Sequence, residues 1–209
     1  MPALNCTHCA QCTLAIAEVT RDDVPKLSQV WYRAFGTPPN LVLFPDTPCV
    51  RTWWNETNLN DLCHRPYQRF LKVVSSTDPS SVLGYAKWDL EPDRCGERFP
   101  PWHAESDGEH CSEFFDGIEQ QRKNIMAGRK HYYLDMLAVN PDYGRRGAGS
   151  KLVEWGCDLA DQDGVPIYLA SSDAGIRLYQ KFGFEILKDR KDTPNGVHPM
   201  VREPKNFND

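Results

Sequence analysis

The chain lacks the features that mark several large classes of protein. No segment approaches the 18 or more consecutive apolar residues of a membrane-spanning helix. The first residues, MPALNCTHCAQC, lack the apolar core of a secretory signal peptide, which predicts a cytoplasmic, reducing environment. A disulfide framework built from the eight cysteines is therefore not expected.

Basic residues are also too few for a typical nucleic-acid-binding protein. The 24 Lys and Arg are outnumbered by 29 Asp and Glu, which gives a net charge of −5. Neither GxGxxG nor GxxxxGK[ST] occurs, so the two common nucleotide-binding loops are missing. These absences predict no nucleic-acid partner and no membrane partner.

The patterning that is present predicts one α/β domain. A length of 209 residues suits a single core, and strands alternate with helices along it, which predicts a mixed sheet. We expect tails at 1–13 and 204–209, a domain over 14–203, and an insertion over 91–130 before the fourth strand. Strands are predicted at 14–20, 69–75, 82–90, 132–139, 166–170, 185–188 and 197–202. Helices are predicted from about 24 to 35 and at 50–63, 112–127, 147–163 and 174–182, with proline-rich loops at 36–48 and 91–108.

The segment YYLDMLAVNPDYGRRGAGSKLVEWG, residues 132–156, is the most informative. A strand ends at Asn140-Pro141, and a short run of arginines and glycines then leads into an amphipathic helix. Glycines at a helix start let backbone approach a ligand, and the unpaired first-turn N–H groups with the helix dipole attract anions. Arg145 and Arg146 add positive charge, so the loop predicts a site for a phosphate-bearing cofactor, although a plain helix start with convenient glycines has the same pattern.

This segment resembles the acetyl-CoA signature of the GNAT superfamily of N-acetyltransferases, [Q/R]-x-x-G-x-[G/A]. Gly147 and Gly149 occupy the glycine positions, whereas Gly144 stands where Gln or Arg is usual. The blocks VPIYLASSDAGIRLYQKFGFEIL, LAIAEVTRDDVPKLSQVWYRAF and VLGYAKWDL extend the resemblance over roughly 14–202, and the wording is most similar to small fungal members. The resemblance implies a strongly bent mixed sheet of about six to seven strands, four to five flanking helices, and splayed fourth and fifth strands.

The resemblance also implies where acetyl-CoA, the co-substrate, would bind. The backbone of Leu137 and Val139, with Ala138 between them, would pair with the pantetheine arm, and the Leu137 N–H would polarise the thioester carbonyl. Tyr179 matches the tyrosine that protonates the thiolate of coenzyme A. The remaining contacts with the cofactor would come from Arg145, Arg146, Gly147, Ala148, Gly149, Ser150 and Ser172.

Acetylation of an amine also needs a base, because an amine with a pKa of about 10 arrives protonated near neutral pH. Asp135 is the candidate, since it interrupts an apolar strand and strict alternation would place it on one face with Tyr133, Leu137 and Val139. Related arylalkylamine N-acetyltransferases have histidine bases at the positions of Tyr133 and Asp135. A structural carboxylate is the alternative.

Other conspicuous residues give weaker expectations. His131 is predicted to be exposed beside the strand, and Trp31, Phe35 and Trp88 to wall an acceptor pocket. Ser171 and Ser172 would cap a helix or touch the cofactor. No metal site is predicted, because the triplet Cys6, Cys9 and Cys12 has no second ligand pair and the nine acidic residues of 91–119 form no EF-hand.

The sequence thus favours direct acetyl transfer from acetyl-CoA to a primary amine, held with the cofactor in a ternary complex. A small molecule such as an arylalkylamine, polyamine, amino sugar or drug is the expected acceptor, and the protein is expected to be a monomer or homodimer. Two alternatives stay open: acetylation of a protein lysine or N-terminus, and a non-catalytic acyl-CoA-binding module.

Overall fold

The computed structural model describes residues 13–94, 101–187, 194 and 196–205. Within them, seven strands form one sheet in the order β1-β2-β3-β4-β5-β7-β6. The pair β4–β5 is parallel, and every other neighbouring pair is antiparallel. The strands are β1 (Leu14–Glu18), β2 (Gln68–Ser75), β3 (Asp78–Asp89), β4 (Tyr132–Val139), β5 (Ile167–Ser171), β6 (Glu185–Ile186) and β7 (His198–Arg202). The predicted α/β fold with a mixed sheet is confirmed.

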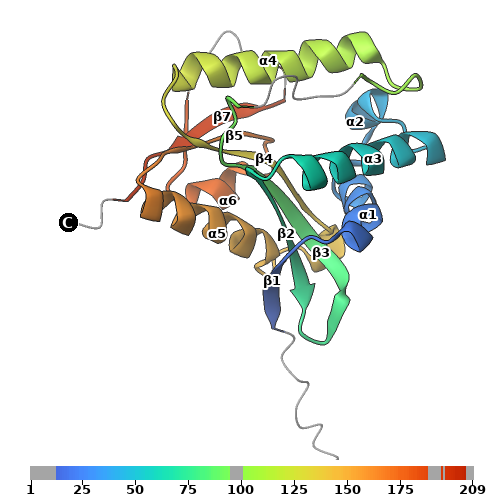
Figure 1. Cartoon of the computed structure of the whole chain (residues 1–209), viewed down its shortest axis with the longest axis horizontal. Coiled ribbons are helices and arrows are strands. Elements are labelled where there is room, and N and C mark those ends of the chain that lie inside the picture. The colour runs from blue at the N-terminus through green and yellow to red at the C-terminus, as the bar shows by residue number, and fades with distance from the viewer. Residues whose placement is uncertain (1–12, 95–100, 188–193, 195, 206–209) are drawn as a thin grey trace, which may run out of the picture.

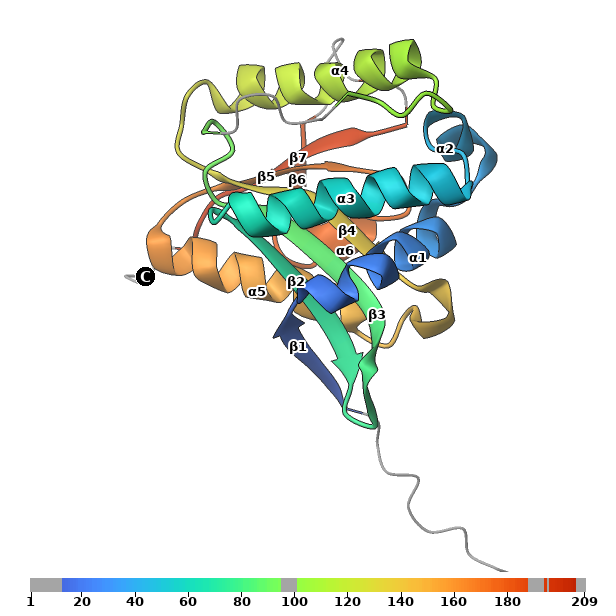
Figure 2. The ribbon, with the colours of Figure 1, turned by 45° about the vertical axis from the view of Figure 1, so that its right-hand side comes forward.

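Helices cover both faces of this sheet (Figures 1 and 2). One face packs on α5 (Ala148–Asp163) and α6 (Ile176–Gln180), where Leu152, Val153 and Leu169 belong to the larger core cluster. The helices of the other face are α1 (Val24–Phe35), α2 (Pro38–Leu43), α3 (Pro48–His64) and α4 (Gly108–Met126). Two short 3-10 turns, η1 (Arg21–Asp23) and η2 (Pro141–Tyr143), complete the described elements.

The helix α2 corrects the prediction that residues 36–48 form a loop and raises the number of described α-helices above the expected four to five. Its two prolines, Pro38 and Pro39, stand in the first turn, where a missing N–H costs no helical hydrogen bond. Leu43 at its end is buried in the second core cluster. Burial of this apolar side chain therefore stabilises the helix, although the high proline content of the segment predicts a loop.

The long helix α5 begins and ends at glycines with left-handed backbone. Gly147 has φ +91° before its first turn, and Gly164 has φ +63° after its last. Both conformations suit glycine and disfavour side chains with a Cβ atom. The start of α5 lies beside the end of β4, since a Cβ atom at Gly149 would come within 3.6 Å of Val139, and this contact positions the predicted cofactor loop.

The strands β4 and β5 separate after a short paired stretch. Their register runs only from Tyr132–Ile167 to Leu134–Leu169. Beyond it, β4 continues beside β3 while β5 pairs with β7 up to Ser171. The expected splay of the fourth and fifth strands is therefore confirmed.

None of the described helices combines the length and the apolar character needed to cross a membrane.

Candidate functional site

A β-bulge interrupts β4 at Asp135. Met136 pairs with Lys87 and Leu134 pairs with Trp88, so Asp135 stands opposite no residue of β3. The hydrogen bonds at the two ends of the strand agree with this. The N–H of Tyr132 donates to Pro166 on the β5 side, whereas the N–H of Asn140, eight positions later, donates to Leu83 on the β3 side. An uninterrupted strand would keep both on one side, so one extra residue lies between them.

The bulge corrects the prediction of strict alternation along β4. Before it, Tyr133 packs on the α4 side of the sheet; after it, Leu137 and Val139 pack in the core on the α5 side. Asp135 itself meets Lys87, whose side chain lies over the ring of Phe70 on the α1 and α3 side. Bulges add a residue without a pairing partner, a feature that sequence alternation cannot show.

The same bulge frees a strand edge for a ligand. Because Asn140 donates toward β3, the alternation of an antiparallel ladder turns the N–H groups of Leu137 and Val139 away from β3, toward the splay. The register of β4 with β5 ends at Leu134, so β5 does not pair with these positions. An extended chain could add to this edge as a further strand.

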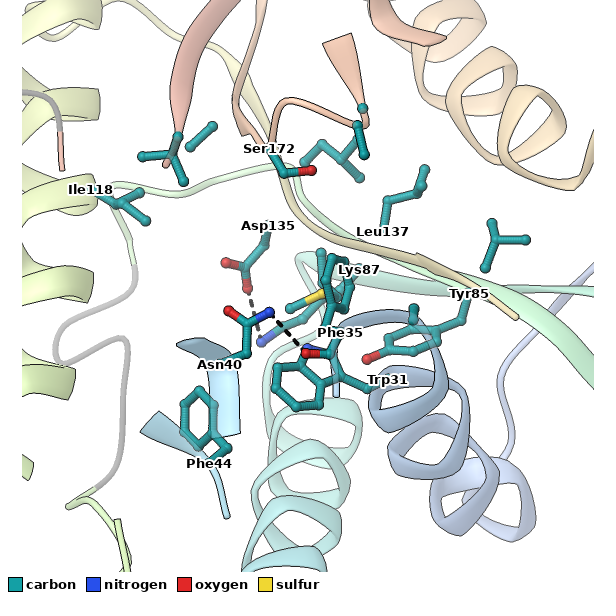
Figure 3. A pocket seen from close by; sticks show the side chains of 18 of the residues that line it. Trp31, Phe35, Asn40, Phe44, Tyr85, Lys87, Ile118, Asp135, Leu137 and Ser172 are labelled. Carbon is teal, nitrogen blue, oxygen red and sulfur yellow. Dashed lines mark hydrogen bonds and ion pairs between the residues drawn. The ribbon is translucent and has the colours of Figure 1, made fainter. Parts of the chain in front are cut away.

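The splay opens into a cleft of about 1820 Å³ (Figure 3). Ten of the twelve residues predicted to bind cofactor or to act in catalysis line it: Asp135, Leu137, Val139, Arg145, Gly147, Ala148, Gly149, Ser150, Ser172 and Tyr179. The other two do not line it. Ala138 is buried in the core behind α1, and Arg146 lies over the ring of Tyr143 at 5.5 Å.

One half of the cleft has the features of an anion site. No side chain caps the N-terminus of α5, and the first N–H groups of a helix have no partner within it. Arg145 lines the cleft beside this helix start and has the uncommon φ of +58° for a non-glycine residue. At Gly149, a Cβ atom would lie 3.1 Å from Leu178, so glycine permits the close packing of α5 on α6.

A network of alternating charges crosses the other half. Lys87 Nζ lies 2.7 Å from Asp61 and 3.1 Å from Asp135, and Asp61 also accepts the ion pair of Arg65 at 3.1 Å. The side chains of Lys87 and Asp135 are 12% and 10% exposed. Buried carboxylates persist when cations compensate them, so the network explains how Asp135 is held in the wall of the cleft.

Two tyrosine hydroxyl groups belong to the same cleft. Burial raises the pKa of Tyr179 above its ordinary value. Burial, with the negative charge of Asp135, also raises the pKa of Tyr85. Both groups therefore carry their protons at neutral pH.

The two serines predicted to cap a helix or to touch the cofactor do not cap α6. Ser171 Oγ donates to the carbonyl of Ser172, and no side-chain hydrogen bond caps α6.

Two predictions about neighbouring residues are wrong. His131 is 2% exposed rather than exposed, because its Nδ1–H donates to the carbonyl of Arg129 and its Nε2 accepts from the buried Arg122. Burial and the charge of Arg122 lower the pKa of His131. Trp88 does not line the cleft: its ring packs on Gly156 of α5, on the other face of the sheet.

Sequence reasoning missed several polar residues of the cleft, among them Asn40, Asp61, Tyr85 and Lys87. Lys87 could have been found, because it is a charged residue within the predicted strand segment YAKWD, as Asp135 is within its own strand. Asp61 and Asn40 gave no such indication, since Asp61 lies in a polar helix and Asn40 in a segment predicted as loop.

The triplet Cys6, Cys9 and Cys12 lies outside the described residues, and the described residues hold no cluster of metal-ligating side chains.

Curated relatives match parts of this chain. A probable acyltransferase SID5 of Ajellomyces capsulatus is 46% identical over 43 residues, which are 21% of this chain and 32% of that protein. N-alpha-acetyltransferase 50 of Danio rerio is 33% identical over 76 residues, 34% of this chain and 45% of that protein. The chain thus spans less than half the length of these relatives.

Solved structures match nearly the whole chain in fold. A mosquito arylalkylamine N-acetyltransferase like 5b has a TM-score of 0.62 at 14% identity, covering 91% of this chain and 100% of that one. The PaiA N-acetyltransferase of Thermoplasma acidophilum, solved in complex with coenzyme A, has a TM-score of 0.58 at 14% identity, covering 91% and 99%. At these identities the likeness concerns the fold.

The sequence model of the Acetyltransferase (GNAT) family matches residues 49–184, which is more than half of the chain and contains the bulged strand, the glycine loop and α6. The chain therefore belongs to the GNAT family of acetyltransferases, whose members use acetyl-CoA.

Proposed function

We propose that the protein is an acetyl-CoA-dependent N-acetyltransferase that transfers the acetyl group directly to the primary amine of a small molecule. The observation that carries this proposal is the bulge at Asp135. It turns the N–H groups of Leu137 and Val139 toward the splay while it leaves the carboxylate of Asp135 in the same cleft.

The residues of the cleft fit acetyl-CoA. The free edge of β4 suits the amide groups of the pantetheine arm, and the uncapped start of α5 with Arg145 suits the pyrophosphate. Gly147 has open space around the position of a Cβ atom, so its backbone is accessible. Arg145 offers the positive charge that Gly144 cannot supply at the usual Gln or Arg position. Bound here, acetyl-CoA supplies the acetyl group as a thioester.

Three groups of the chain have separate roles in the proposed reaction. Asp135 takes a proton from the ammonium of the acceptor, directly or through a water molecule, which leaves the neutral amine to attack the thioester carbon. The nearby Lys87 stabilises the ionised form of Asp135. The N–H of Leu137 donates to the carbonyl oxygen on which negative charge grows. The hydroxyl of Tyr179, kept protonated by burial, donates its proton to the departing sulfur.

The size and cover of the cleft support a small acceptor. A pocket for one ligand typically has about 300–1,000 Å³, and this cleft of about 1820 Å³ has room for two substrates at once. Its outer walls come from α1, α2, α3 and α4, which leave a walled space rather than a bare sheet edge. The rival is acetylation of a protein N-terminus, an activity named for the relative from Danio rerio.

Release of free coenzyme A from acetyl-CoA tests the proposal when it is followed with a panel of small amines and, in parallel, short peptides with free N-termini or lysines. We expect turnover of at least one small amine and none of the peptides. Turnover of peptides alone would favour the rival. Tight binding of acetyl-CoA in calorimetry without turnover of any acceptor would indicate a non-catalytic binding module.

A further inference from the structure

Aromatic side chains gather in the half of the cleft that faces away from the glycine loop. We call six of them the aromatic wall; they come from α1, the end of α2, α3, and the segment leading into α4. The members are Trp31, Phe35, Phe44, Trp54, Trp102 and Phe115, of which Phe44 directly follows α2 and Phe115 lies in the second turn of α4 itself.

The rings of the aromatic wall hold one another in place. The ring centroids of Trp31 and Trp54 lie 4.8 Å apart, and Phe44 meets Trp54 edge-on at 4.6 Å. Trp102 and Phe115 lie 5.4 Å apart. Contacts at these separations are favourable for aromatic pairs. The wall is therefore a preorganised apolar surface, with rings that pack together and still border the cleft.

One side chain next to this wall has a fixed polar orientation. The Nδ2 of Asn40 donates to the carbonyl of Phe35 at 2.9 Å, and Thr37 Oγ1 lies 3.4 Å from it. A carbonyl can only accept, so the amide cannot be reversed without losing this bond. No described residue donates to Asn40 Oδ1. The Asn40 side chain therefore offers an acceptor to a ligand in the cleft.

Figure 3 shows Asn40 and Asp135 in the same cleft as three rings of the wall, those of Trp31, Phe35 and Phe44. The other rings of the wall also line this cleft. An amide oxygen and a carboxylate together suit a group that carries several N–H donors, such as an ammonium. Building on the proposed function, we infer that the acceptor is a primary amine joined by a short linker to an aromatic ring. Its ring packs on the aromatic wall, and its nitrogen donates to Asn40 Oδ1 in front of Asp135.

The same surface disfavours the other expected acceptors. The second ammonium of a diamine would lose water against apolar rings, which is costly for a charge. The hydroxyl groups of an amino sugar would need hydrogen-bond partners along the wall, and Trp102 Nε1 already donates to Ser112 Oγ. An aromatic body needs no such partners.

A comparison of amine substrates with the unaltered protein distinguishes these classes of acceptor. Rates of coenzyme A release at saturating acetyl-CoA are compared for 2-phenylethylamine, n-butylamine, 1,4-diaminobutane and glucosamine. We expect kcat/KM for 2-phenylethylamine to exceed that of each other amine by about thirtyfold or more, the effect of burying a phenyl group. A preference for the diamine or the amino sugar, or equal rates, overturns the inference and leaves the proposed function standing. Turnover of peptides alone overturns both.

A pair of variants tests the role of Asn40. Asn40→Leu should raise KM for 2-phenylethylamine about tenfold or more, the scale of one hydrogen bond to a charged group, with KM for acetyl-CoA unchanged. Asn60→Leu is the matched control, because Asn60 is exposed on α3 and lies outside the cleft. Calorimetry of the amine binding to the coenzyme A complex should show the same loss. An unchanged KM in folded Asn40→Leu overturns the assignment of Asn40, and the amine series still decides the substrate class if that variant unfolds.

Discussion

The ammonium group of Lys87 lies 3.1 Å from the carboxylate of Asp135, across two adjacent strands and with both side chains largely buried. An ammonium at this distance stabilises the ionised carboxylate and restrains its rotation. In the proposed mechanism Asp135 must be ionised before it can accept a proton, and the ammonium of Lys87 favours that ionised form. The same positive charge lowers the basicity of the carboxylate. Replacement of Lys87 can therefore show which of these two opposing effects dominates.

Replacement of Asp135 tests whether it is the base. We expect Asp135→Asn to bind acetyl-CoA normally and to lose turnover by about 10²-fold or more near neutral pH, the usual scale for a general base. Rates measured from pH 7 to pH 9.5 should recover part of the loss, because more of the amine is then neutral. Full activity at pH 7 would assign the role of general base to another group, and an unfolded variant would indicate that Asp135 is a structural carboxylate.

Removal of the Lys87 charge should shift the pH profile. In Lys87→Met, Asp135 loses the ammonium that stabilises its ionised form, so the acidic limb of kcat/KM should move to higher pH.

Lys72→Met is the matched control for that variant. Lys72 is equally buried at 12% side-chain exposure and pairs with Asp23 at 2.5 Å, but it lies outside the cleft. Both variants should lose stability, and Lys87→Met alone should move the limb. Equal pH profiles for the two would contradict the contact between Lys87 and the base.

The hydroxyl of Tyr179 should affect the transition state more than binding. Tyr179→Phe keeps the ring that packs edge-on against Phe184 at 5.8 Å and removes only the proton donor. Turnover should fall at least tenfold while KM for acetyl-CoA changes little. Steady-state kinetics of the two proteins provide the comparison, and equal turnover numbers would assign Tyr179 to packing alone.

The sequence predicted the elements well where their cause was local. The strand over 132–139 matches β4 residue for residue, because two tyrosines begin a run that is apolar apart from Asp135, and Asn140-Pro141 ends it. The bulge at Asp135 could not be predicted, since it depends on register against β3. The pairing of Lys87 with Asp61 was likewise hidden, because 26 residues separate two side chains that only the packing of α3 on the sheet brings together. Local signals thus located the glycine loop at the start of α5, whereas the other half of the cleft is assembled by tertiary contacts that those signals do not contain.

The glycine loop can be tested with a pair of variants that each place a side chain on a left-handed backbone at one end of α5. Gly147→Glu places a side chain and a negative charge at the uncapped start of α5, so acetyl-CoA affinity should fall by at least 10²-fold in calorimetry. Gly164→Glu carries the same substitution at the other end of the helix, where φ is also positive and no atom lies within 4 Å of the Cβ position. That control should lose some stability and keep its affinity for acetyl-CoA. Equal affinities in both proteins would place the pyrophosphate elsewhere.

The packing of α5 on the sheet depends on the absence of a side chain at Gly156. A Cβ atom there would lie 2.2 Å from the Trp88 ring, which is itself fully buried. Alanine improves helix propensity by about 1 kcal/mol over glycine, but overpacking a rigid core typically costs about 1–3 kcal/mol and more for severe overlap. We therefore expect Gly156→Ala to destabilise the fold on balance and to lower the melting temperature by several degrees. Gly108→Ala at the start of α4 is the control, since its Cβ atom would meet Trp102 at an ordinary 3.7 Å, and its melting temperature should stay the same or rise. If thermal unfolding shows Gly156→Ala to be as stable as that control, α5 can move away from Trp88, and the helix that follows the glycine loop is held less tightly than its packing indicates.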